Sequence, residues 1–292
     1  MTTLIPNTVQ YFADDEYTFA NLECTFSDRS LSPVGYPTFY FRAPTSYVNI
    51  LLEGGVDFVT TANNHLSDFG DKGVEDTYAT LDNAGLPYGK VGQAQVVTTK
   101  NGIKIGIYCG FNINDGYFVP TTDECVNAIN QMKADGAEYI VMAFHWGKEL
   151  YYKPTQKMID LAQACIDAGA DLIYGTHPHV LGPIVEYNGG IIMYSVGNWS
   201  FGGNTQPTDQ DTAIVQVTIK RDVDGSITTE GYDAIPCCVS SNMSGGVGYN
   251  DYKPTPYPED NEGYKRVLSK LDMNSGWENA NKDYSAWYSA WG

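Results

Sequence analysis

The sequence predicts an α/β protein in which helices cover a mainly parallel sheet. Strand-like and helix-like segments alternate along most of the chain, which is the pattern of βαβ units. The strand-like segment at 138–147 is apolar on both faces, as expected of a strand buried between two layers. Each histidine follows a strand-like segment. The length of 292 residues suggests one large domain or two modest ones.

The elements can be placed in order along the chain. Strand-like runs occupy 102–111, 138–147, 171–175, 189–197 and 211–222, and the stretch 56–65 starts as a short β-branched run and ends in a polar turn. Helical apolar spacing marks 73–86, 125–136, 154–170 and 259–271. Gly85 should stop the first helix, and Pro154 should begin the third. The later strands are expected to pair antiparallel.

Composition excludes two classes of partner. Lys and Arg number 17 against 35 acidic residues, which gives a net charge of −18. Nucleic acids and anionic membranes bind clustered basic residues, so neither is expected as a partner. An anionic substrate stays open, because a bound metal ion inverts the local field. No apolar run reaches the ~18 residues of a membrane span, and no secretory segment follows Met1.

The six cysteines contain no CxxC pair, so buried thiols are expected rather than bridges. Cys237 and Cys238 fit either a redox pair or two neighbours on opposite strand faces, and we expect the second. From about Ser240 the composition becomes rich in Gly, Asn, Pro and aromatic residues. This C-terminal segment fits either a carbohydrate-binding surface or an arm that packs on the main domain, and we expect the arm. The expected division is therefore a main domain at 1–240 and an aromatic arm at 241–292.

The four histidines mark a candidate metal site. His177 and His179 flank a single proline after one strand, while His65 and His145 follow two others. In open α/β sheets, ligands bind at the carboxyl ends of the strands. Neutral imidazole is the commonest ligand of transition metals. Because residues two apart point to opposite sides of extended backbone, His177 and His179 can address one ion each, or one ion and its partner.

An oxygen ligand is also needed, because histidines alone bring no balancing negative charge. Glu23, in the stretch FANLECTFSD, is the best candidate. Asn64 adds an amide oxygen beside His65. The sequence therefore predicts a site built from imidazole, carboxylate and amide groups.

Five ordered stretches carry a family resemblance: ANLE (20–23), TTANNHLSDFGDKGVEDTYATLDNAGL (60–86), AFHWGKE (143–149), GADLIYGTHPHV (169–180) and YSVGNWSF (194–201). Together they resemble the CapA family of poly-γ-glutamate capsule synthesis proteins, within the calcineurin-like metallophosphoesterase superfamily. The resemblance implies a four-layer α/β/β/α sandwich with a dinuclear metal site at the strand ends. It also implies a place at the extracytoplasmic cell envelope, although no anchor is visible in this sequence.

The resemblance also implies roles for single residues. Glu23 matches the metal-bridging acid and Asn64 the asparagine ligand. His145 and His177 match ligands of one ion, and His179 matches a ligand of the other.

Four further positions are of interest beside these ligands. His65 matches the histidine that acts on the leaving group, as general acid. Asp68 and Gly70 match the family pattern but are expected as turn and cap residues. Glu149 fits either an outer partner of His145 or an ordinary carboxylate at a helix start.

One departure from the family concerns its first strand, which ends in Gly-Asp and holds the first metal. No Gly-Asp precedes Glu23, and Asp14 and Asp15 fit an exposed turn better. Either the natural chain begins further upstream, or this member lacks that ligand and the first strand. We therefore expect one divalent transition metal ion (manganese, iron or zinc) rather than two.

Two functions follow from the resemblance. The first is metal-dependent hydrolysis of a phosphoester or a γ-glutamyl amide during capsule synthesis. The alternative is a non-catalytic, metal-binding accessory protein in the assembly or export of an anionic polymer. The expected partners are an anionic polymer or phosphoester substrate and other capsule-synthesis proteins.

Overall fold

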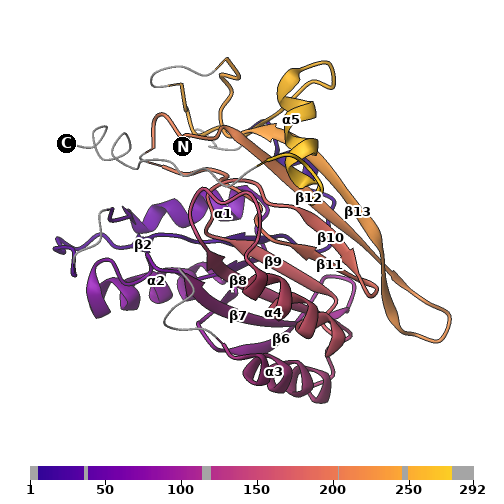
Figure 1. Ribbon diagram of the computed structural model, residues 1–292. Helices are drawn as coiled ribbons and strands as arrows, with labels where there is room; N and C mark the ends of the chain where they lie inside the picture. The colour runs from indigo at the N-terminus through magenta and orange to yellow at the C-terminus, as the bar shows by residue number, and fades with distance from the viewer. Residues whose placement is uncertain (1–5, 36–38, 114–119, 203, 245–248, 278–292) are drawn as a thin grey trace.

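A six-stranded sheet forms the largest layer of the computed structural model, which describes residues 6–35, 39–113, 120–202, 204–244 and 249–277 (Figure 1). Its order is β10-β11-β9-β8-β7-β6. The strands are β6 (Ala94–Thr98), β7 (Lys104–Ile113), β8 (Tyr139–Gly147), β9 (Leu172–Thr176), β10 (Ile184–Tyr187) and β11 (Gly190–Met193). The inner four run parallel, and the two edge strands pair antiparallel.

A second layer of strands packs on one face of this sheet. Its parallel part contains β1 (Phe19–Asn21), β4 (Phe58–Thr60) and β5 (Tyr88–Gly89). Its antiparallel part contains β12 (Asp211–Arg221), β13 (Ile227–Cys238) and β14 (Thr255–Pro256). The core between the two layers is apolar, and it includes Phe58, Ile107 and Val141. A short parallel pair, β2 (Thr25–Phe26) and β3 (Arg42–Ala43), lies beside α2.

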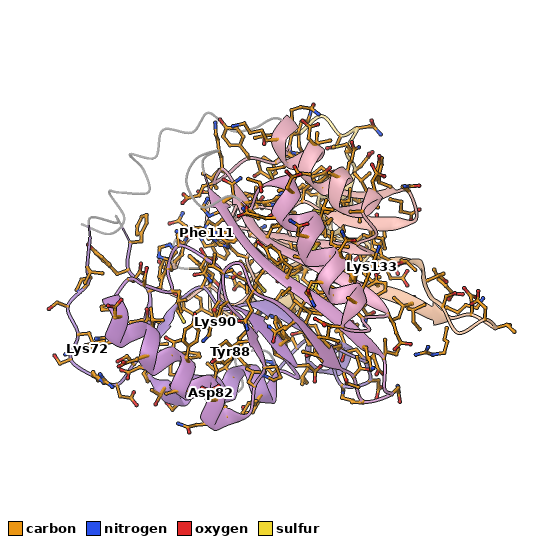
Figure 2. All side chains as sticks on the ribbon, turned by 90° about the horizontal axis from the view of Figure 1, so that it is seen from below. Lys72, Asp82, Tyr88, Lys90, Phe111 and Lys133 are labelled. Atoms are coloured by element: carbon orange, nitrogen blue, oxygen red, sulfur yellow. The ribbon has the colours of Figure 1, made fainter. Side chains whose placement is uncertain are left out.

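Helices form the two outer layers. On the six-stranded sheet lie α3 (Thr122–Ala134) and α4 (Gln156–Asp167), while α1 (Val48–Glu53) and α2 (Gly70–Ala84) cover the β1-β4-β5 sheet. Figure 2 shows Lys72 and Asp82 of α2 on one side of the strands and Lys133 of α3 on the other. Two 3-10 turns, η1 (Val9–Tyr11) and η2 (Thr45–Tyr47), complete the N-terminal part. The four-layer α/β/β/α arrangement is therefore confirmed.

Most predicted elements match within a few residues. The helix expected at 73–86 begins at Gly70 and ends at Ala84, and Gly85, with a φ of 66°, caps it as predicted. The sequence missed β13, the longest strand, because its polar alternation includes Gly231 and Pro236. In the described part of the chain, β1 pairs only with β4, and no strand lies along its other edge.

The C-terminal part packs on β12 and β13 through α5 (Glu262–Leu271). The Lys270 ammonium, 2% exposed, donates hydrogen bonds to both Asp209 and Asp211. It also lies 4.7 Å from the ring centroid of Trp277. The tail tryptophans Trp287 and Trp291 lie outside the described residues, so the boundary expected at residue 240 stays a prediction.

All six cysteines are free thiols, and Cys237 and Cys238 are both buried at the end of β13. Among the described residues, no helix combines the length and the apolar character that crossing a membrane needs.

Asp171 lies at the start of β9, where its carboxylate accepts the Ile140 backbone N–H at 2.7 Å. Burial raises the pKa of Asp171 to about 6. The folded state therefore binds this proton more tightly than the unfolded chain, and ionisation costs stability as pH rises from about 4 to 6. Asp171→Asn should gain up to about 3 kcal/mol over wild type between pH 4 and 8. Urea unfolding across this range tests it, and a pH-independent difference would contradict it.

Candidate metal centre

The carboxyl ends of strands from both sheets meet at one place and bring ligand-type side chains together. Six residues form this histidine cluster: Glu23, Asn64, His65, His145, His177 and His179. Glu23 follows β1, and His177 directly follows β9. His145 is the third-last residue of β8. The parallel strands explain this convergence, because their carboxyl ends share one edge.

Glu23 stands between two histidines. Its Oε1 atom lies 3.6 Å from Nε2 of His145 and 3.6 Å from Nε2 of His179. Its other oxygen accepts a hydrogen bond from the Asn21 amide at 3.0 Å. The Oε1 atom is buried and has no hydrogen-bond partner. Burial raises the pKa of Glu23, while the nearby imidazole of His179 acts in the opposite direction.

His145 is oriented by Thr176, whose hydroxyl lies 2.9 Å from Nδ1. The Thr176 hydroxyl also donates a 3.4 Å hydrogen bond to the Phe144 carbonyl, which fixes its place beside the ring. The Nε2 atom of His145 lies 2.8 Å from the Asn64 amide oxygen, at hydrogen-bond distance. Burial lowers the pKa of His145 well below its usual value, and the neighbouring His177 lowers it further. The imidazole is therefore neutral, which is its ligating form.

The loop after β9 presents His177 and His179. Both residues have positive φ, 97° and 57°, which side-chain-bearing residues rarely adopt and which concentrates at functional sites. Burial also lowers the pKa of His177 well below its usual value, and its Nδ1 has no hydrogen-bond partner. His179 donates Nδ1–H to the Asn198 side-chain oxygen at 2.8 Å. Its Nε2 is thereby left as a lone pair facing Glu23.

His65 has a different environment. Its Nδ1 lies 2.9 Å from the Asp68 carboxylate, which also accepts the Phe41 backbone N–H at 2.7 Å. The Phe41 ring packs edge-on against the imidazole, with 4.4 Å between centroids. Asp68, expected as a turn residue, thus also orients His65 in the manner of a carboxylate–histidine pair. Nε2 is the ring nitrogen that does not face Asp68.

Other candidates from the sequence lie as follows. Gly70 begins α2 with a φ of 67°. Asp14 and Asp15 precede β1, at the opposite end of that strand from Glu23, so neither reaches the cluster. Glu149 offers a carboxylate oxygen within 4.8 Å of ring nitrogens of His177 and His179. Asn198 was missed as a partner of His179, although the stretch YSVGNWSF contains it.

The donor set fits a cation. Glu23, His145 and His177 each offer one ligand atom, and these three atoms lie within 4.8 Å of one another. The oxygen of Asn64 adds a fourth lone-pair group. Two buried atoms of the cluster, Glu23 Oε1 and His177 Nδ1, have no hydrogen-bond partner, and a divalent ion would satisfy both. Imidazole with carboxylate suits zinc, iron and manganese.

A sandwich of this kind, with ligand-type groups gathered at the strand ends of both sheets, defines the metallophosphoesterase class of fold. Within that class, the chain belongs to the family described as bacterial capsule synthesis protein PGA_cap, whose model matches residues 1–202.

Two curated relatives agree with that family. The PGA biosynthesis protein CapA of Bacillus subtilis (strain 168) is 27% identical over 293 residues, which cover 91% of this chain and 71% of that protein. The capsule biosynthesis protein CapA of Bacillus anthracis is 30% identical over 232 residues, which cover 72% of this chain and 56% of that protein. A solved structure of a Mycoplasma pneumoniae phosphatase aligns at 16% identity with a TM-score of 0.49, covering 78% of this chain and 84% of that one.

Proposed function

We propose that the histidine cluster is a metal-dependent hydrolase site that acts on a phosphoester or a γ-glutamyl amide during capsule polymer synthesis. The observation that carries the proposal is the buried Glu23 oxygen, which has no hydrogen-bond partner and lies 3.6 Å from two imidazole nitrogens. Glu23, Asn64, His145 and His177 would hold the ion. A bound divalent ion would supply an activated water and polarise the scissile group.

The remaining chemistry belongs to the protein. His65 carries no ligand role in this proposal, and the Asp68 carboxylate fixes its ring so that Nε2 can give a proton to the leaving group. The aromatic rings of Phe41 and Phe201, 5.1 Å apart, pack against His65 and His179 respectively. The two rings place apolar surface beside His65 and His179.

We extend the proposal to the partners and the place of action, and family membership supports it. An anionic polymer or phosphoester is the proposed substrate, and a bound cation would anchor it in a chain whose net charge is −18. Work beside other capsule-synthesis proteins at the extracytoplasmic envelope is part of the same proposal.

Metal analysis tests the ligand set. Purified wild type should retain at least one transition metal ion per chain, and His177→Ala should lose it, because three donors within 4.8 Å become two. All four histidines belong to the cluster, so the control is Gln131→Ala on the exposed face of α3, which should keep the wild-type metal content. Equal metal content in wild type and His177→Ala would contradict the proposal.

A second candidate is an accessory protein that binds metal and polymer without turnover. The two Bacillus relatives are named for biosynthesis, not for hydrolysis. Assays with added manganese, iron or zinc separate the candidates, using phosphomonoesters, phosphodiesters and γ-glutamyl peptides. A chain that binds metal but cleaves none of these would favour the accessory role.

A further inference from the structure

Glu149 lies on a loop that is hydrogen-bonded to the segment carrying His177 and His179. The loop leaves β8 at Gly147, whose φ is 82°, and passes through Leu150, whose φ is 60°. The Leu150 N–H donates a 2.8 Å hydrogen bond to the carbonyl of Pro178, the residue between His177 and His179. Two loops from neighbouring strands are thus joined directly at the cluster.

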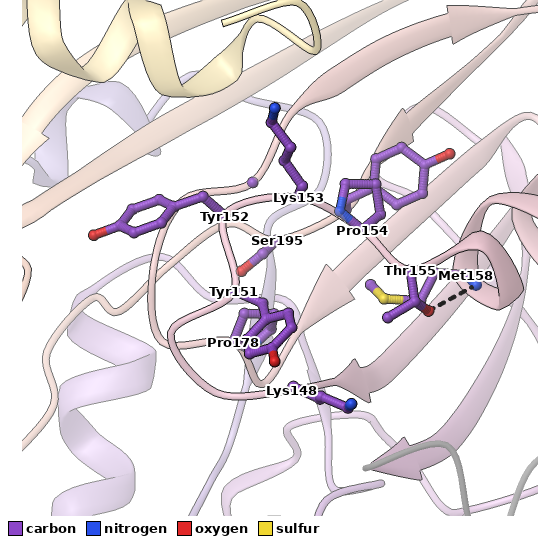
Figure 3. A pocket seen from close by; sticks show the side chains of 11 residues that line it. Lys148, Tyr151, Tyr152, Lys153, Pro154, Thr155, Met158, Pro178 and Ser195 are labelled. Atoms are coloured by element: carbon purple, nitrogen blue, oxygen red, sulfur yellow. Dashed lines mark hydrogen bonds between the residues drawn. The ribbon is translucent and has the colours of Figure 1, made fainter. Parts of the chain in front are cut away.

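Hydrogen bonds also hold the rest of this loop in place. The Tyr152 hydroxyl donates to Asp209 at 2.9 Å, and Thr155 caps α4 by accepting the Met158 N–H at 3.3 Å. Residues 151–155 of this loop, with Lys148 and Pro178, line part of a cavity of about 10 Å³, which is room for about one water molecule (Figure 3). Glu149 therefore projects from a supported backbone.

The carboxylate of Glu149 forms a second ligand group. Glu149, His177 and His179 each offer an atom, and these atoms lie within 4.8 Å of one another. His177 belongs to both groups, yet one ring nitrogen has a single lone pair and binds one ion. With His177 assigned to the ion beside His145, Glu149 and His179 are left for a neighbouring position. Glu23 Oε1 is 3.6 Å from Nε2 of both His145 and His179, so it can serve both positions.

We infer that Glu149 is a metal ligand and that, with His179 and the shared Glu23, it holds a second divalent ion beside the first. The inference rests on the proposed function, since the first ion belongs to that proposal. It adds a carboxylate ligand to a cluster for which the sequence predicts one ion. Two divalent ions against two glutamates leave a net charge of +2, which suits an anionic substrate.

Metal stoichiometry tests this inference without an activity assay. Titration of metal-free protein with Mn²⁺, followed by calorimetry and elemental analysis, should give about two ions per chain for wild type. Glu149→Gln should give about one, with the loss confined to the second binding step. The matched control is Glu53→Gln, an exposed glutamate at the end of α1, which should keep both ions. Circular dichroism and thermal unfolding of the metal-free proteins should show Glu149→Gln folded like wild type.

The outcomes separate the two proposals. Wild type with one ion, or Glu149→Gln with the stoichiometry and affinities of wild type, overturns the second ion while the first stands. Wild type that binds no Mn²⁺, Zn²⁺ or Fe²⁺ overturns the proposed function itself. Spectroscopy gives an independent readout, because neighbouring Mn²⁺ ions sharing a carboxylate should show exchange coupling. That coupling should be absent in Glu149→Gln.

Discussion

Replacing Lys270 by methionine should lower the free energy of unfolding by about 3–5 kcal/mol. The Lys270 ammonium is 2.8 Å and 2.7 Å from the two Asp209 oxygens and 2.6 Å from Asp211. Burial alone would raise the pKa of Asp211, but hydrogen bonds from Arg266 and Lys270 outweigh it, and the net pKa is lowered. Methionine fills a similar volume but leaves two buried carboxylates short of one positive charge.

The control for this prediction is Lys265→Met on the same helix. Lys265 is 66% exposed and lies 3.3 Å from Glu262, an exposed pair whose loss should change stability by less than about 0.5 kcal/mol. Urea unfolding of both variants gives the comparison. Adding Asp209→Asn to Lys270→Met should recover part of the loss, because it removes one stranded carboxylate. Equal stabilities of the two lysine variants would show that the carboxylates do not depend on Lys270.

The sequence located Lys270 on a helix but did not reveal its burial. Buried positions of α5 include Gly263, Val267, Lys270 and Leu271, a helical spacing that places the lysine on the packed face. That spacing indicates that Lys270 is buried, and a buried lysine needs acidic partners. Its partners Asp209 and Asp211 are about 60 residues away, and no local pattern connects them.

The cluster itself was accessible from sequence because topology alone brings it together. Parallel strands share a carboxyl edge, so His145 and His177 had to meet once β8 and β9 were recognised as neighbours. The residues that orient the histidines were not accessible. Asp68 and Asn198 occur in turn-like stretches where Asp and Asn are common for local reasons, so their residue type carried no signal.

The position of Glu149 was also beyond local reasoning. Its approach to His177 and His179 depends on the positive φ of Leu150 and on a hydrogen bond to Pro178 across two loops. Leu is an unusual residue at positive φ, so neither feature has a sequence signature. The sequence predicts the types of ligand and the edge of the sheet at which they lie. The conformation of the loop after β8 determines that the Glu149 carboxylate lies near His177 and His179.

His65→Ala should lower kcat by about 10²–10⁴-fold while leaving the metal content unchanged. The magnitude is that of a lost general acid, because His65 Nδ1 is engaged with Asp68 at 2.9 Å and Nε2 remains to give a proton to the leaving group. A substrate whose leaving group needs no protonation, such as a nitrophenyl ester, should lose less than one with an alkoxide leaving group.

Two companion variants decide between proton donation and assembly. His177→Ala removes a ligand, so it should abolish turnover and metal retention together. Asp68→Asn keeps the His65 ring but removes its charged partner, so it should lower kcat less than His65→Ala does. Elemental analysis and steady-state kinetics of all three variants give the measurement. If His65→Ala loses its metal in step with its activity, then His65 acts as a ligand and the proton must come from another group.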